Sequence, residues 1–241
     1  LKKAALCGIT TPGTLTISPP NIEFDIVAEA KDLDLDPART CLAGGTFKAD
    51  GTFNLKGRFQ GRGKAADLLQ TSTGQLEFTA VDGHIYHDVV MLEVLKFLNT
   101  LDVFDGRANV RDMGEKGFGY HAFRVKAELQ DGKLRYDEAV LHAHPMVATA
   151  AGEHDLQTEK FNLTLLVAPL VALDRIFEHI PIIGGILEAL DTIPMSAKGT
   201  PDDIHIYPLK PSAIGYELQE IMKKTVERPL NLIHGDKKGT E

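Results

Sequence analysis

The sequence is constrained most by an alternation of apolar and polar residues with a period of two. In the segment 22–30 the even positions are apolar, while Glu23, Asp25 and Glu29 occupy odd positions. Between residues 47 and 60 the apolar side chains occupy odd positions instead. Successive side chains of a strand point to opposite faces, so this pattern predicts antiparallel strands with one apolar and one solvated face.

Asp-Gly pairs between the alternating segments predict tight turns. Across residues 131–132 the apolar positions change from odd to even, which predicts a two-residue hairpin with Leu129 opposite Leu134. The same change occurs across residues 82–83 and predicts a second hairpin. A slip of one residue in either register would turn the apolar side chains toward water.

A third turn is predicted at Asp50-Gly51, where the apolar positions stay odd on both sides. This phase requires a loop of odd length, with Gly51 in the left-handed region and Phe47 opposite Phe53. The hairpins form one antiparallel meander of about ten to twelve strands. Its other strands are expected at residues 4–10, 14–17, 147–156, 161–167 and 204–207.

Helices are expected at four places along this meander. The clearest is Asp88–Asn99, with Asp88 as candidate N-cap; it is apolar nearly all round, so it is buried or covers an apolar surface. A short helix is expected at 64–70 and another at 170–179. An amphipathic terminal helix is expected at 212–227, with Ser212 as candidate cap.

Composition disfavours several classes of function. Lys plus Arg number 26 and Asp plus Glu 34, which gives a net charge of −8. A nucleic-acid partner is therefore not expected, because it requires a basic surface. The sequence contains no run of about 18 or more apolar residues, so no membrane-spanning helix is predicted. The sequence starts with Leu1, and we expect it to be part of a longer protein. We expect residues 1–234 to form one domain and residues 235–241 to be a disordered polar tail.

The only two cysteines, Cys7 and Cys41, lie near the start of the chain. They form either a disulfide, which requires an oxidising compartment, or two buried free thiols. The residues alone leave both alternatives open.

No motif predicts an enzyme. Residues 61–66 read GRGKAA and match a dinucleotide fingerprint, but the preceding strand belongs to a predicted hairpin rather than a parallel βαβ unit. His142 and His144 share one face of a predicted strand without a zinc-binding spacing, so a metal hydrolase around them is a rival hypothesis only. No nucleophile elbow is present. We therefore expect no catalytic residues, no metal and no cofactor.

The apolar face of the predicted sheet is either ordinary core, covered by helices, or a groove partly open to an apolar ligand. The candidate lining residues are the apolar side chains of the alternating strands: Phe47, Phe53, Leu55, Phe59, Leu76, Phe78, Ile85, Phe123, Val125 and Leu134. The candidate gate or plug residues lie in the apolar helical segments: Met91, Leu95, Leu98, Ile176, Ile180, Ile182 and Ile183.

Several short segments, taken in order, resemble one known family. They are LCGI at 6–9, CL at 41–42, GTFNLKG at 51–57, TGQLEFTA at 73–80, DGHIY at 82–86, LKFLN at 95–99, GEHDL at 152–156, VAPL at 167–170 and IPIIGGI at 180–186, with Met146 among them. Together they make residues 6–232 similar to the C-terminal region of AsmA-like proteins of the Gram-negative cell envelope, the group that includes TamB and YhdP.

The resemblance implies a location and a role. Proteins of this family are anchored in the inner membrane by an N-terminal helix, which we expect in a segment of the parent protein outside this sequence. Their periplasmic bodies are long β-sheets curled into a groove thought to carry phospholipid acyl chains between the two membranes, and they have no catalytic residues. An oxidising periplasm also favours a disulfide between Cys7 and Cys41.

We therefore predict a mainly β fold with α elements (α+β): a long antiparallel β-meander curled into a half-barrel or groove, with apolar helices packed on its concave side. The expected function is non-catalytic, namely binding or channelling phospholipid or other acyl lipid for lipid transport or homeostasis between inner and outer membrane. Envelope membrane or outer-membrane proteins are further expected partners. The alternative is a structural or interaction module that assists outer-membrane protein assembly through strand-edge binding.

Overall fold

The computed structural model describes residues 4–43, 48–87, 89–100, 116–144, 146–169, 192–201 and 203–227. Their strands form one open 13-stranded sheet, and every strand pair in it is antiparallel. The strand order is β1-β2-β4-β6-β7-β8-β9-β10-β11-β12-β13, with β3 beside β4 and β5 beside β7. The prediction of a mainly β, antiparallel fold with few helices is confirmed.

The strands differ widely in length. They are β1 (Ala5–Leu6), β2 (Ile9–Thr10), β3 (Gly13–Ser18), β4 (Asn21–Asp34), β5 (Lys48–Ala49), β6 (Thr52–Lys64), β7 (Thr73–His87), β8 (Phe118–Gln130), β9 (Lys133–Ala143), β10 (Met146–Asp155), β11 (Lys160–Pro169), β12 (Ile193–Thr200) and β13 (Asp203–Pro208). The helices are α1 (Leu35–Ala43), α2 (Leu68–Thr71), α3 (Val89–Thr100) and α7 (Tyr216–Glu227), with short 3₁₀ turns at Ala65–Asp67 and Pro211–Ala213.

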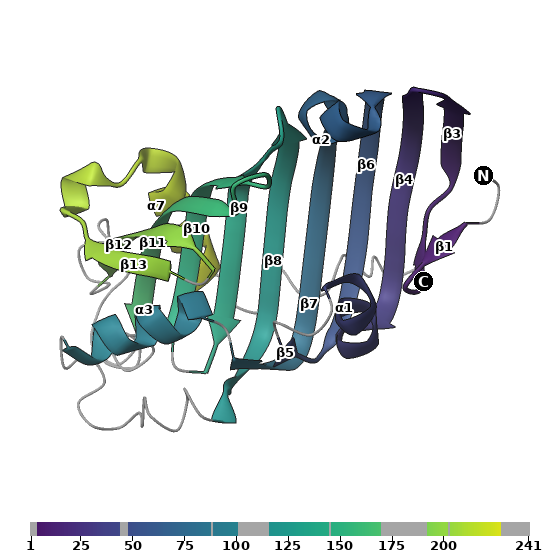
Figure 1. Ribbon diagram of the computed structural model, residues 1–241. Coiled ribbons are helices and arrows are strands. Elements are labelled where there is room, and N and C mark those ends of the chain that lie inside the picture. The colour runs from purple at the N-terminus through teal and green to yellow at the C-terminus, as the bar shows by residue number, and fades with distance from the viewer. Residues whose placement is uncertain are drawn as a thin grey trace, which may run out of the picture.

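The long strands β4, β6, β7 and β8 lie side by side, with β3 and β1 at one edge (Figure 1). At the other end of the sheet, β12 and β13 cross the direction of these strands, as the accumulated twist of a many-stranded sheet requires. Helices α1 and α2 lie at opposite ends of the long strands, and α3 packs against β13.

The predicted hairpin at Asp131-Gly132 is confirmed. Leu129 of β8 pairs with Leu134 of β9, and Gln130 pairs with Lys133. Asp131 and Gly132 have φ angles of 52° and 72°, so both central residues are left-handed, as a type I′ turn requires.

The other two predicted hairpins are wrong. Residues 82–83 lie inside the continuous strand β7, where Asp82 has a φ of 49°; the pairing with β8 keeps its register here, whereas the pairing with β6 and β5 shifts by one residue. At Asp50-Gly51 the chain does not reverse, because β5 and β6 both pair with β7. An Asp-Gly pair supplies left-handed backbone to a β-bulge as readily as to a turn, and long twisted strands need bulges.

The helix predictions are confirmed in part. The helix expected at 88–99 is α3, and the one expected at 64–70 is the 3₁₀ turn followed by α2. The terminal helix starts at Tyr216, so Ser212 lies in the preceding 3₁₀ turn rather than at the helix cap. Helix α1 and strand β12 were not predicted from the sequence. The helix expected at 170–179 lies outside the described residues.

The core is divided between the two faces of the sheet. The larger cluster packs Leu95 and Leu98 of α3 together with strand side chains such as Phe53 and Met195. The smaller cluster lies on the opposite face of β10 and β11, where Met222 of α7 is fully buried. Helix α3 therefore packs on the face that carries the predicted groove residues, whereas α7 covers the other face.

Candidate apolar binding face

The strand registers bring the predicted groove residues onto one face of the sheet. We call this surface the apolar face and define it by the side chains in register with Phe78 of β7. One directly paired row across it consists of Ala30, Leu55, Phe78, Val125, Ala139, Ala150, Leu165 and Met195. The row crosses β4 and every strand from β6 to β12, so the alternation read from the sequence produces one continuous apolar surface.

The apolar face carries no Asp, Glu, Lys or Arg at its described strand positions in β3 to β13. Its centre is aromatic: the rings of Phe53 and Phe78 stack at 5.7 Å, and Phe123 meets Phe78 edge-on at 6.0 Å. Such a surface offers an apolar ligand dispersion contacts without unpaired charges.

Burial of the predicted groove residues changes along the strands. Phe53 and Ile85, toward the α1 end, are buried, with 2% and 7% of their surface exposed. Those half-buried are Leu55, Phe59, Leu76, Phe78, Phe123, Val125 and Leu134. Phe47 lies outside the described residues. The apolar face is therefore filled core at one end and partly open toward the end near α2.

The predicted gate residues are placed only in part. Leu95 and Leu98 on α3 are almost fully buried, at 1% and 0% exposure, within the cluster of the apolar face. The side chain of Met91 and the residues Ile176, Ile180, Ile182 and Ile183 lie outside the described part of the chain. Helix α3 thus covers the β13 side of the apolar face.

Two glutamines link the two halves of the sheet at the end near α2. The amide Nε2 of Gln70 in α2 donates to Oε1 of Gln157, in the turn between β10 and β11, at 3.0 Å. The Gln70 side chain also packs so closely on Gly132 that a Cβ there would lie 2.4 Å from its Nε2. The turns of β8–β9 and β10–β11 therefore both reach α2.

One ionisable group of the apolar face, His154, was not among the predicted groove residues. His154 of β10 pairs with Leu134 and Phe161, and its ring stacks on Phe161 at a centroid distance of 4.0 Å. Its Nε2 is buried and has no hydrogen-bond partner. Burial lowers the pKa of His154, partly opposed by Glu159 and Asp155, so the ring is held neutral on an apolar surface.

A hydrogen-bonded hub around Asp50 was not anticipated from the sequence. The backbone N–H of His84 and the hydroxyl of Tyr86 donate to the Asp50 carboxylate at 2.6 and 2.7 Å. The hydroxyl of Tyr120 donates to the Asp50 carbonyl at 2.7 Å. Burial, helped by Asp50 and Asp82, raises the pKa of Tyr120 to about 12, so its hydroxyl stays a donor. The hub joins the bulges of β5–β6 and β7 and fixes the register of the groove strands.

The opposite face of the sheet, here the charged face, carries ion pairs between neighbouring strands. Arg58 binds Asp25 through two hydrogen bonds of 3.1 and 2.7 Å, which hold the pKa of Asp25 below its usual value. Arg135 binds Glu128 at 2.7 Å. Cross-strand pairs of opposite charge favour the observed register, and their exposure keeps this face solvated.

Two surface hollows lie on the charged face. One, of ≈ 510 Å³, is lined by Arg58, Gln60, Thr73, Gly74, Gln75, Glu128, Leu129 and Gln130. The other, of ≈ 770 Å³, is lined by Gly8, Thr10, Glu29, Ala30, Lys31, Leu33, Asn54, Leu55, Lys56, Glu77 and Thr79. Among the predicted groove residues that the structure describes, Leu55 borders one of these two hollows.

Histidines gather at the α1 end of β8 and β9. The ring of His121 lies 4.7 Å from that of His144 and 5.9 Å from that of His142. Burial, with smaller effects of His121 and His144, lowers the pKa of His142. Within the described ranges no group of three or more His, Cys, Asp or Glu side chains is arranged to hold a metal ion.

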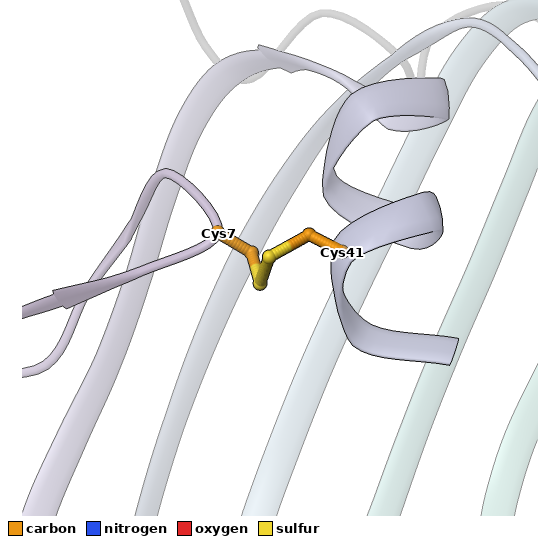
Figure 2. The surroundings of a disulfide bond; sticks show 2 residues. All are labelled: Cys7 and Cys41. Carbon is orange, nitrogen blue, oxygen red and sulfur yellow. A yellow bond between two sulfur atoms is a disulfide. The ribbon is translucent and has the colours of Figure 1, made fainter. Parts of the chain in front are cut away.

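The two cysteines are joined in a disulfide, as the family resemblance favoured. Cys7 lies in the turn between β1 and β2, and Cys41 lies on α1, with their Cα atoms 5.6 Å apart (Figure 2). The bond ties α1 to the β1–β2 hairpin at the edge of the sheet. Such a bond is compatible with an oxidising compartment.

Comparisons with known proteins leave the family open. No protein-family model, curated protein or solved structure matches the chain. In the described part of the chain, no helix combines the length and the hydropathy that a membrane crossing needs.

Proposed function

We propose that this chain is an AsmA-like envelope module that binds acyl chains of phospholipid or another lipid on its apolar face, without catalysing a reaction. The observation that carries the proposal is the continuous uncharged surface running through Leu55, Phe78 and Val125, half-buried rather than filled toward α2. Each methylene moved from water onto such a surface contributes about 0.8 kcal/mol.

A curled sheet would let this surface surround an acyl chain. The strands β7 to β10 span three strand spacings, roughly 14 Å in a flat sheet. The hydrogen bond between Gln70 and Gln157 joins segments at both ends of this span at 3.0 Å. This bond supports a sheet that curls toward its apolar face, with α2 and the two neighbouring turns at one end of the groove.

The periplasm of a Gram-negative cell is the location that fits both the disulfide and the lipid. The Cys7–Cys41 bond requires oxidation, and lipid exchange between inner and outer membrane requires a soluble carrier surface in that space. A parent protein with an inner-membrane anchor would place this module there.

Native mass spectrometry of the purified protein, followed by lipid extraction, tests the proposal. We expect phospholipid or fatty acid to co-purify in stoichiometric amount. Leu76→Glu, which places a charge on the apolar face, should abolish it. Thr79→Glu adds the same charge to the same strand on the charged face, opposite Arg124, and should retain lipid. A folded wild-type protein without lipid, confirmed by no binding of a fluorescent fatty acid, would overturn the proposal.

A second candidate function is strand-edge binding in the assembly of outer-membrane proteins. It is favoured by β3, an edge strand with two exposed apolar side chains, Leu15 and Ile17. Edge binding tolerates a filled core, so a lipid-free protein that captures an unfolded outer-membrane protein strand would favour this function over lipid binding.

A further inference from the structure

The edge strand β3 lacks the features that normally prevent an exposed sheet edge from pairing with a strand of another chain. In the described part of the chain it pairs only with β4. Its six residues, GTLTIS, contain no charged side chain. Leu15 and Ile17 are 49% and 64% exposed. Natural proteins block exposed edges with charges, bulges or covering elements, so an uncharged edge with apolar side chains indicates a pairing surface.

The backbone of β3 has hydrogen-bonding groups directed away from β4. The N–H of Val27 in β4 donates to the carbonyl of Pro12 at 2.8 Å. In an antiparallel ladder, residues alternate between bonding to one neighbour and pointing away from it. Even-numbered residues of β3 therefore bond to β4, while the N–H and C=O groups of Leu15 and Ile17 point outward.

The opposite edge of the sheet is protected. Strand β13 carries Asp203 and His205, whose side chains pair at 3.3 Å, and α3 packs against it. The edge at β13 is thus charged and covered, whereas the edge at β3 is uncharged and exposed. Strand β3 is therefore the edge suited to pairing.

We propose that β3 pairs with β3 of a second copy of this chain, antiparallel and about a two-fold axis perpendicular to the sheet. With the axis through Thr16, Leu15 of each copy lies opposite Ile17 of the other, so the outward backbone groups bond mutually. Both pairs lie on the apolar face, which continues into the second copy, and Thr16 meets Thr16 on the charged face. The contact is isologous: both copies use the same strand, and each provides the backbone hydrogen-bonding groups and apolar side chains that pair with those of the other.

Charge and shape allow this pairing despite the net charge of −8. The acidic residues nearest the edge, Glu23 and Asp25 of β4, are paired with Arg62 and Arg58 at 3.8 and 2.7 Å. The β1–β2 hairpin extends the edge only beyond the Gly13 end of β3. In the proposed two-fold dimer this hairpin therefore lies past the Ser18 end of the other copy's β3.

Analytical ultracentrifugation over a dilution series tests the proposal. The molar mass measured for the wild-type protein should be twice its chain mass of 26.3 kDa. Ile17→Lys should give a monomer. Tyr216→Lys removes a large exposed side chain on α7, 75% exposed against 64% for Ile17, with the same change in charge, and should leave the dimer intact. A wild-type protein that stays monomeric, or a dimer that survives Ile17→Lys or is lost in both variants, would overturn the proposal.

Hydrogen exchange of the wild-type protein gives a second readout that does not depend on a variant folding. The amides of Leu15 and Ile17 should exchange more slowly in concentrated than in dilute solution, while that of Thr16, already bonded to β4, should change less. Equal exchange at both concentrations would contradict pairing through β3.

Discussion

The disulfide between Cys7 and Cys41 allows a prediction whose magnitude follows from the loop that it closes. The two residues are 34 apart in sequence, so the bond closes a loop of about 35 residues in the unfolded chain. The chain-entropy model gives roughly 13 cal/mol/K for such a loop, or about 4 kcal/mol at 25 °C. Cys7 is only half-buried and Cys41 is exposed, so replacing both by serine removes little buried surface. Loss of the cross-link should therefore dominate the effect.

We expect the double variant Cys7→Ser/Cys41→Ser to lose about 3–4 kcal/mol of unfolding free energy, a large share of the 5–15 kcal/mol typical of a folded protein. Equilibrium urea unfolding measures the loss. The urea m-value should rise, because the unfolded chain without the bond exposes more surface. Wild-type protein in reductant should match the variant, and reductant should not change the variant itself. A loss below about 1 kcal/mol would refute the chain-entropy reasoning.

Three further substitutions or conditions test the packing described above. Gly83→Ala should cost about 2 kcal/mol or more, because its Cβ would lie 2.0 Å from the Asp50 carbonyl, whereas Gly215→Ala, with no atom within 4 Å, should stay within about 0.5 kcal/mol; urea unfolding compares them. Met222→Ala should cost about 2–5 kcal/mol in the same assay, because this fully buried side chain fixes α7. Stability should fall as the pH drops through 6.5, the ordinary pKa of histidine, because unfolded His142 takes up a proton that the folded state resists. Thermal melts from about pH 7.5 to 5.5 should show this fall, and His142→Gln should reduce it by up to about 1.4 kcal/mol per pH unit.

The face pattern of the sheet could be predicted from sequence because it depends on local alternation. Leu55, Phe78 and Val125 were assigned to one surface from parity alone, and their registers confirm it. The hairpin at Asp131-Gly132 was predictable for the same reason, since its two-residue loop changes the phase.

The two bulges could not be distinguished from turns by the same reasoning. Asp82 has the left-handed backbone of the confirmed turn residue Asp131, with φ angles of 49° and 52°. A bulge and a turn at an Asp-Gly pair differ only in which strand the following residues pair with. Long-range packing determines that partner strand. The hub around Asp50, which includes Tyr120 from a distant strand, was hidden for the same reason.

Helix α1 was missed although the sequence contained a signal for it. Pro37 lies in the first turn of the observed helix, a position where proline is favoured. Cys41 on this helix forms its disulfide with Cys7, which lies in the first turn of the chain.

The two proposals depend on different groups and can fail separately. Lipid binding uses side chains in the middle of the apolar face, such as Leu76, whereas pairing uses the outward backbone groups of β3. Ile17 belongs to both, since its side chain lies at the margin of that face. If Ile17→Lys gives a monomer that still carries lipid, the middle of the face suffices for binding. If it loses dimer and lipid together while Leu76→Glu remains a dimer without lipid, the bound chain crosses the paired edge, and the two apolar faces form one continuous binding surface.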